Sequence, residues 1–155
     1  MPAAEKTAVD AFDIDRANFT IRFERRLGAA PAAVFDAWTK PEEISLWWDP
    51  EGRPLLRCEI DLRVGGRFAF ATRSHPEMPF TGSYQEIQPP GRLVFDGLGA
   101  IGTVLIVGEG AGTRLTVLIR CASAEHFEQF LKIGVAKGTA QTLDNLVAFT
   151  GRRAA

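Results

Sequence analysis

The sequence predicts an α+β protein in which a curved antiparallel sheet of about seven strands wraps around a long C-terminal helix. Three observations support this fold class. Short segments with alternating apolar and polar residues follow one another at hairpin-like spacing. Two short helical patterns come after the first strand, and the last 30 or so residues have helical periodicity. Because a curved sheet cannot fill its own concave face, we expect the last helix to lie in it.

Length and charge limit the class of protein. The 155 residues are enough for one domain with a sizeable core. We divide the chain into a loose polar lead-in, residues 1–17, and a single domain, residues 18–152. The net charge of −1 gives no general attraction to nucleic acid. No stretch is typical of a signal peptide or long enough for a membrane span, so we expect a cytoplasmic protein without membrane insertion.

The first strand is predicted by alternation between Phe19 and Leu27. Arg25 falls on its apolar phase. Either a bulge or an inward-pointing charge would explain this position, and we favour the bulge.

Two short helices are expected between residues 31 and 50. Pro31 suits the first turn of a helix that carries Trp38 on its apolar stripe. Thr39 and Glu42 fit a capping box for a second helix, which places Ile44, Trp47 and Trp48 on one face and ends at Asp49-Pro50.

The middle of the chain is predicted to be all strand. Apolar residues alternate from Leu56 to Val64, and Gly65-Gly66 then favours a two-residue hairpin turn with positive φ angles. The later strands are expected at Phe68–Phe70, Phe80–Gln88, Leu93–Phe95, Thr103–Val107 and Leu115–Cys121.

The C-terminal segment is predicted to be one long helix. Ser123 is a good N-cap, and Phe127, Phe130 and Leu146 share its apolar face. Gly134 and Gly138 fall on the same face in mid-helix, where glycine costs roughly 1 kcal/mol relative to alanine. Close approach to the sheet is the ordinary reason for such glycines, and unfilled volume is the functional alternative.

No catalytic constellation is apparent. The acid–base candidates are His75, His126, Glu86, Asp61 and Tyr84, and for each one a non-catalytic position is the expected interpretation. Whether Tyr84 and Glu86 face inward or outward is open. The two cysteines lack metal-ligand spacing and are expected to be buried thiols, so we predict neither metal nor cofactor.

Several segments resemble a known family. They are similar to the START-like helix-grip superfamily (SRPBCC), and most similar to its branch named after the activator of the heat-shock protein 90 ATPase. That branch often carries a tryptophan where Thr139 stands here. The resemblance rests on APAAVFDAWTKPEEISLWWDP (Ala30 to Pro50), DLRVGGRFAF (Asp61 to Phe70), YQEIQPPGRLVF (Tyr84 to Phe95), GTRLTV (Gly112 to Val117) and GVAKGTAQTLDNLVAF (Gly134 to Phe149).

The resemblance implies a function as well as a fold. The superfamily commonly encloses a hydrophobic cavity for lipids, sterols, polyketides or other apolar molecules, and some members catalyse cyclisation or dehydration there. The eponymous activator has a second, N-terminal domain for which this chain has no room, so a chaperone partner is not expected. We therefore predict binding of a small apolar molecule. A cyclase or dehydratase and a protein-interaction module are the alternatives, and the sequence leaves a homodimer open.

The predicted cavity lies between the last helix and the sheet, with the tryptophans near its mouth. Arg120 is included as a cationic anchor for an acidic ligand, on the condition that it points inward. The full predicted set is Trp38, Trp47, Trp48, Phe68, Phe70, Tyr84, Phe95, Arg120, Phe130, Gly134 and Gly138.

Overall fold

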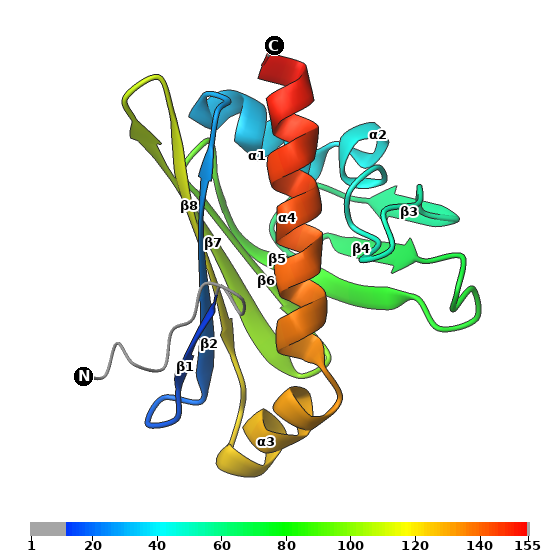
Figure 1. The fold of residues 1–155 in the computed structure, drawn as a ribbon. Helices are drawn as coiled ribbons and strands as arrows, with labels where there is room; N and C mark the ends of the chain where they lie inside the picture. Colours follow the sequence, from blue (N-terminus) through cyan, green and yellow to red (C-terminus); the bar gives the residue numbers. More distant parts are fainter. Residues whose placement is uncertain (1–11, 155) are drawn as a thin grey trace.

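An eight-stranded antiparallel sheet curves around the long helix α4 (Figure 1). The structure is a computed structural model that describes residues 12–154. In chain order its elements are β1 (Phe12–Asp15), β2 (Thr20–Leu27), α1 (Pro31–Thr39), α2 (Pro41–Ile44), β3 (Arg57–Ile60), β4 (Arg67–Ala71), β5 (Phe80–Gln88), β6 (Arg92–Gly97), β7 (Ala100–Glu109), β8 (Gly112–Arg120), α3 (Ala124–Lys132) and α4 (Val135–Ala154).

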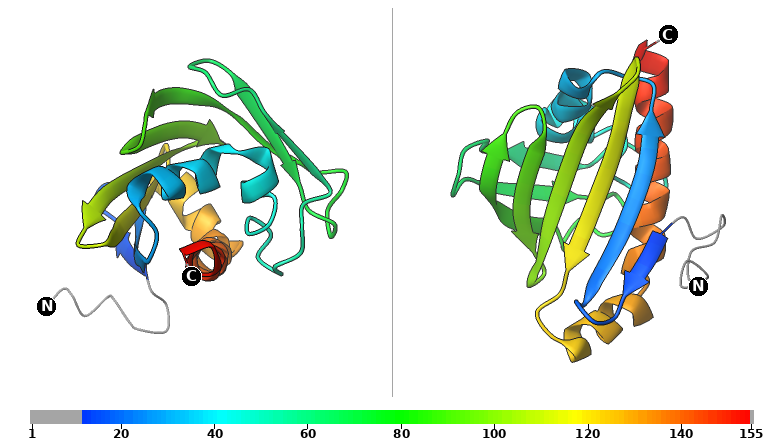
Figure 2. Two further views of the ribbon diagram at one scale, coloured as in Figure 1. Left: turned by 90° about the horizontal axis from the view of Figure 1, so that it is seen from above. Right: turned by 90° about the vertical axis from the view of Figure 1, so that its left-hand side faces the viewer.

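The sheet order is β1-β2-β8-β7-β6-β5-β4-β3, with every neighbouring pair antiparallel. Seen from above, the sheet curves around α1 and α4, and α1 and α2 cross one end of the concave face (Figure 2). The predicted fold class is confirmed, with one strand more than expected. Within residues 12–154, no helix is both long enough and apolar enough to cross a membrane.

The additional strand is β1, which falls inside the predicted lead-in. Phe12 pairs with Phe23 of β2, and their ring centroids are 5.8 Å apart. Phe12 and Ile14 are half-buried against the core. The prediction of a loose segment is therefore wrong for residues 12–15, and residues 1–11 lie outside the described part of the chain.

The predicted bulge at Arg25 is absent from the described pairing of β2. That strand pairs with β8 in one continuous register, so Arg25 keeps the inward phase of its apolar neighbours. Its side chain is 9% exposed. Nε donates to Asp144 Oδ1 at 3.1 Å and a guanidinium N–H donates to the carbonyl of Ala140 at 3.3 Å. The inward-pointing charge, the alternative interpretation, is correct because α4 supplies these acceptors.

Helix α1 begins at Pro31 as predicted, but the capping box before α2 is wrong. Lys40 is the N-cap of α2 and makes no side-chain cap bond. The hydroxyl of Thr39 instead donates to the carbonyl of Phe35 at 2.8 Å, inside α1. Helix α2 ends at Ile44, so both following tryptophans lie in the turns after it.

The hairpin between β3 and β4 has a longer turn than predicted. Strand β3 ends at Ile60, and β4 begins only at Arg67. Of the two glycines in this turn, Gly65 alone has a positive φ, +84°. Leu62 and Val64 are exposed rather than on an inner face. Alternation continued past the end of the strand, so it overestimated the length of β3.

The predicted C-terminal helix is two helices. The Ser123 side chain caps α3 by accepting the backbone N–H of His126 at 3.1 Å, as expected. Gly134 then adopts φ +87° between α3 and α4. A positive φ is unfavourable for residues with a Cβ, so glycine suits a helix ending there. Of the two predicted mid-helix glycines, Gly138 lies within α4 and Gly134 does not.

Candidate functional site

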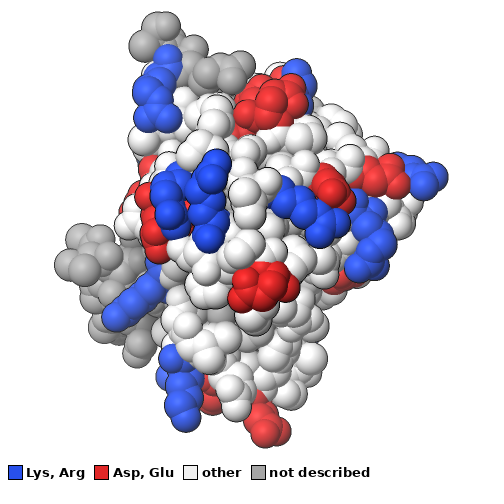
Figure 3. Space-filling model, turned by 90° about the vertical axis from the view of Figure 1, so that its right-hand side faces the viewer, with Lys and Arg blue, Asp and Glu red and all other residues white. Residues whose placement is uncertain are grey.

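A cavity of about 290 Å³ separates α3 and α4 from the inner face of the sheet. Figure 3 views the molecule from the side on which the β4–β5 loop lies; charged side chains gather in its upper part, and its lower part is mostly uncharged. The residues that line the cavity are Trp38, Trp48, Pro50, Phe80, Phe95, Gly97, Leu98, Ala100, Gly102, Val117, Ile119, Phe130, Val135, Gly138, Thr139, Thr142 and Leu143.

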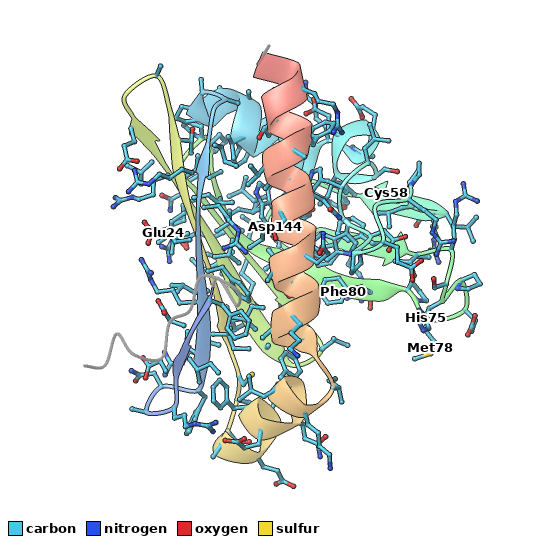
Figure 4. All side chains as sticks on the ribbon, in the orientation of Figure 1. Glu24, Cys58, His75, Met78, Phe80 and Asp144 are labelled. Atoms are coloured by element: carbon cyan, nitrogen blue, oxygen red, sulfur yellow. The ribbon has the colours of Figure 1, made fainter. Side chains whose placement is uncertain are left out.

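Aromatic rings form much of the wall because glycines on the neighbouring strands let them lie flat. Trp48 stacks on Phe80 with centroids 5.6 Å apart and an interplanar angle of 28°. A Cβ on Gly97 would clash with the ring of Phe80, and a Cβ on Gly102 would be 2.8 Å from Phe95. Larger residues at these two glycines would displace the rings. Phe80 lies beside α4 in Figure 4.

Helix α4 holds the loop that carries Trp48 in place. The hydroxyl of Thr142 donates to the Trp48 carbonyl at 3.0 Å. The amide of Asn145 donates to the carbonyl of Asp49 at 2.9 Å and to that of Trp47 at 3.4 Å. Irregular backbone needs such partners where it is shielded from water. The position of the aromatic loop is therefore set by two side chains of α4.

His126 supports the turn between β6 and β7, which contributes Leu98 to the wall. The backbone N–H of Ala122 donates to Nδ1 of His126 at 3.0 Å, which assigns the remaining ring hydrogen to Nε2. Nε2 lies 3.1 Å from the carbonyl of Leu98, an acceptor. The ring also contacts Phe130 edge-on at 4.5 Å. One imidazole thus joins α3, the β8–α3 connection and the β6–β7 turn.

The structure brings together five of the predicted site residues and separates the others from the cavity. Those in the wall are Trp38, Trp48, Phe95, Phe130 and Gly138. A second layer of core behind the wall contains Trp47, Phe68, Phe70 and Tyr84, all buried, and the void beside this layer is only about 10 Å³.

Two predicted residues lie elsewhere. Arg120 is at the exposed end of β8, on the phase opposite to Ile119, which lines the cavity. It does not anchor a ligand there, because successive side chains of a strand point to opposite faces. Gly134 belongs to the break between α3 and α4 and does not line the cavity.

The prediction missed several lining residues that the sequence does signal. Val117 and Ile119 share the inward phase of β8, and Phe80 is on that of β5. Gly97 and Gly102 are strand glycines, which indicate close approach of a ring or another chain segment. Thr139 lies one residue after Gly138, but helical periodicity alone gave no reason to choose it.

The acid–base candidates do not converge on the cavity. His75 lies in the β4–β5 loop far from α4 (Figure 4), and Asp61 is exposed beside Arg63. A register shift between Tyr84 and Glu86 turns Glu86 outward, where it accepts from Arg92 at 2.8 Å. Tyr84 points inward, and burial, followed by the nearby Cys58, raises its pKa, so its hydroxyl stays protonated.

Both thiols are held in their protonated form. Cys121 is buried as predicted, and burial raises its pKa. Cys58, labelled on β3 in Figure 4, is half-buried instead. Burial, and then the charges of Glu42 and Glu59, raise the pKa of Cys58 to about 11. A protonated thiol is a poor nucleophile, so neither cysteine has the environment of a reactive one.

A curved antiparallel sheet that holds a C-terminal helix over an apolar cavity defines a helix-grip protein of the START-like class. The chain belongs to the family described as Activator of Hsp90 ATPase homolog 1-like protein, which matches residues 28–151. No curated protein matches the sequence significantly.

Solved structures show the same fold. A Nitrosomonas europaea protein is 20% identical, with a TM-score of 0.80 over 90% of this chain and 98% of its own. An Arthrobacter aurescens protein is 22% identical, with a TM-score of 0.81 over 91% of each chain. An AHSA1-like protein from Aeromonas hydrophila is 25% identical, with a TM-score of 0.70 over 84% of this chain and 90% of its own.

Proposed function

We propose that the protein binds a small apolar molecule in the cavity between α4 and the sheet. The observation that supports this most directly is the cavity itself, about 290 Å³ bordered by aromatic and aliphatic side chains. Protein interiors normally contain few voids larger than a water molecule. A concave apolar site with a few polar groups is the usual form of a small-molecule site.

The cyclase or dehydratase alternative requires at least two polar groups that exchange protons with a substrate. Among the described residues that line the cavity, the polar side chains are two threonines and two tryptophans. The hydroxyl of Thr142 already donates to the Trp48 carbonyl. None of these groups titrates near neutral pH, which favours binding over acid–base turnover.

The protein-interaction alternative requires an exposed apolar patch on a sheet or helix face. The exposed large apolar side chains in the described part of the chain lie in loops, turns and the end of a strand instead. They are Leu46, Leu56, Leu62, Val64, Met78, Leu98, Val107 and Ile133. This distribution favours a ligand-binding protein, for which a cytoplasmic location remains our prediction.

The test uses 1-naphthylamine, an uncharged two-ring fluorophore, with energy transfer from the protein's tryptophans as the signal. We expect saturable binding to the wild type. Thr139→Trp places an indole in the cavity and should weaken binding at least about tenfold, or 1.4 kcal/mol. Lys137→Trp adds the same side chain at an exposed position of α4 and should leave affinity unchanged.

Two results would contradict the proposal. One is no saturable signal with the wild type, and the other is an equal effect of the two tryptophan substitutions in folded variants. Native mass spectrometry of the purified protein supplies an independent observation, since a co-purified apolar molecule should be released from the wild type and not from Thr139→Trp.

A further inference from the structure

The wall of the cavity restricts the charge of its ligand. None of the described residues that line it is Asp, Glu, Lys, Arg or His. Moving a charged group out of water without a partner is very unfavourable. The part of the ligand that enters the cavity should therefore be uncharged, and an acidic ligand anchored by Arg120 is ruled out by the exposed position of that residue.

Cavity size and wall chemistry restrict the ligand's shape. A dry apolar cavity of about 150 Å³ holds one benzene molecule. The volume here is about 290 Å³, which corresponds to roughly two fused rings on that scale. Five aromatic side chains border it: Trp38, Trp48, Phe80, Phe95 and Phe130. Flat rings can stack or pack edge-on against these walls, as the wall residues do with one another.

One buried polar group in the wall has no partner. The indole N–H of Trp38 is the only buried side-chain donor in residues 12–154 without a hydrogen bond, and the residue is 4% exposed. Its neighbour Trp47 differs, because that indole donates to the Ala37 carbonyl at 3.0 Å. Buried donors are nearly always paired in native proteins, so an unpaired one needs an explanation.

Of the two spaces that border Trp38, only the cavity can hold an acceptor for its indole N–H. The Trp38 ring borders the cavity and also the void of about 10 Å³ next to Tyr84. That void is at the lower limit for a single water and offers almost no polar partners, because apolar and aromatic side chains surround it. The cavity is large enough for an acceptor, and the Trp38 side chain forms part of its wall.

We infer that the ligand is a neutral aromatic molecule of about two fused rings with a hydrogen-bond acceptor, such as a carbonyl oxygen, that accepts from the indole N–H of Trp38. This inference rests on the proposed function and adds the ligand's chemical class and its specificity-determining residue. Trp38 would then select a ketone over a hydrocarbon of the same shape.

The test compares 2-acetylnaphthalene with 2-isopropenylnaphthalene, in which a CH₂ group replaces the carbonyl oxygen, and with charged 2-naphthoate. Each displaces 1-naphthylamine in competition. We expect the ketone to bind at least about fivefold more tightly than the hydrocarbon, and 2-naphthoate at least about a hundredfold more weakly than the ketone. An apolar cavity without a donor would prefer the hydrocarbon, so the sign of the difference is diagnostic.

Nuclear magnetic resonance identifies the donor directly, because the chain has three tryptophans and so three indole N–H signals. The Trp38 proton should shift downfield with the ketone and not with the hydrocarbon, while the paired Trp47 proton stays in place. Trp38→Phe should remove the preference for the ketone. If that variant does not fold, the wild-type spectra alone decide.

Three outcomes separate this inference from the function on which it rests. If 1-naphthylamine and all three compounds fail to bind, the proposed function is wrong. If they bind but the hydrocarbon equals or exceeds the ketone, the function stands and the inference is overturned. A downfield shift of the Trp48 signal in place of the Trp38 signal also overturns the assignment of the donor.

Discussion

The two adjacent tryptophans should differ sharply when each is replaced by phenylalanine. Trp47 is fully buried, and its indole N–H donates to the Ala37 carbonyl. Trp47→Phe leaves a residual cavity, costing about 1 kcal/mol, and an unpaired carbonyl, costing about 1–2 kcal/mol. The free energy of unfolding should fall by about 2–3 kcal/mol, which lowers Tm by about 4–12 °C in a protein of this size.

Trp48→Phe should instead have little effect on stability and a larger effect on ligand affinity. Trp48 is half-buried in the cavity wall, and its indole N–H has no partner in the described part of the chain. Its loss should lower the free energy of unfolding by about 1 kcal/mol or less. The smaller ring reduces one aromatic contact by about 0.5–1.5 kcal/mol, which should weaken 1-naphthylamine binding roughly twofold to tenfold.

The assay pairs denaturant unfolding with energy-transfer titration on both variants. Trp47→Phe should alter stability with little effect on dye affinity, and Trp48→Phe should alter affinity with little effect on stability. The reasoning is refuted if both variants lose the same stability, or if Trp47→Phe abolishes dye binding in folded protein while Trp48→Phe does not.

Two other features give direct tests. Gly134→Ala forces a Cβ into φ +87° and should lower the free energy of unfolding by about 1–2 kcal/mol, whereas Gly138→Ala has open space in a helix and should raise it by about 0.5–1 kcal/mol. Equal effects in denaturant unfolding would contradict the break between α3 and α4. In a Cys121→Ala background, alkylation of Cys58 should rise with pH around a pKa of about 11, against 9.0 for an ordinary thiol. Because the folded pKa is the higher one, the thiol's contribution to stability is complete below pH 9.0 and is lost as pH rises toward about 11. A reactivity midpoint near pH 9.0 in folded protein would show that Cys58 is not shielded.

Alternation predicted most of the strands because it is a local consequence of strand geometry. It placed Ile21 and Phe23 correctly in the core, and it gives Arg25 the inward phase that the continuous register of β2 shows. The acceptors that make an inward arginine acceptable come from α4, more than a hundred residues away. Pattern within one strand carries no information about such partners.

The candidate site was less predictable because it depends on which of the inward-pointing aromatic residues border the cavity and which pack behind them. Phe68 and Phe95 both point inward, yet Phe95 lines the cavity and Phe68 packs behind it. Sheet curvature and strand order decide this, and neither is encoded by residue spacing. Gly134 was ambiguous for another reason, since glycine suits close packing in mid-helix and also a helix ending. Its backbone conformation distinguishes the two.

The hydrogen bonds from Thr142 and Asn145 to the loop carbonyls have a consequence for the proposed ligand binding. These bonds fix the backbone carbonyls of Trp48 and Asp49 to α4, so the loop that carries the Trp48 ring is positioned independently of any ligand. A binding site with a fixed loop of this kind loses little side-chain freedom when a ligand binds. Such a site should not adapt its shape to a larger ligand. Across a series of ligands of increasing size, affinity should therefore fall abruptly once the ligand exceeds the volume of the cavity.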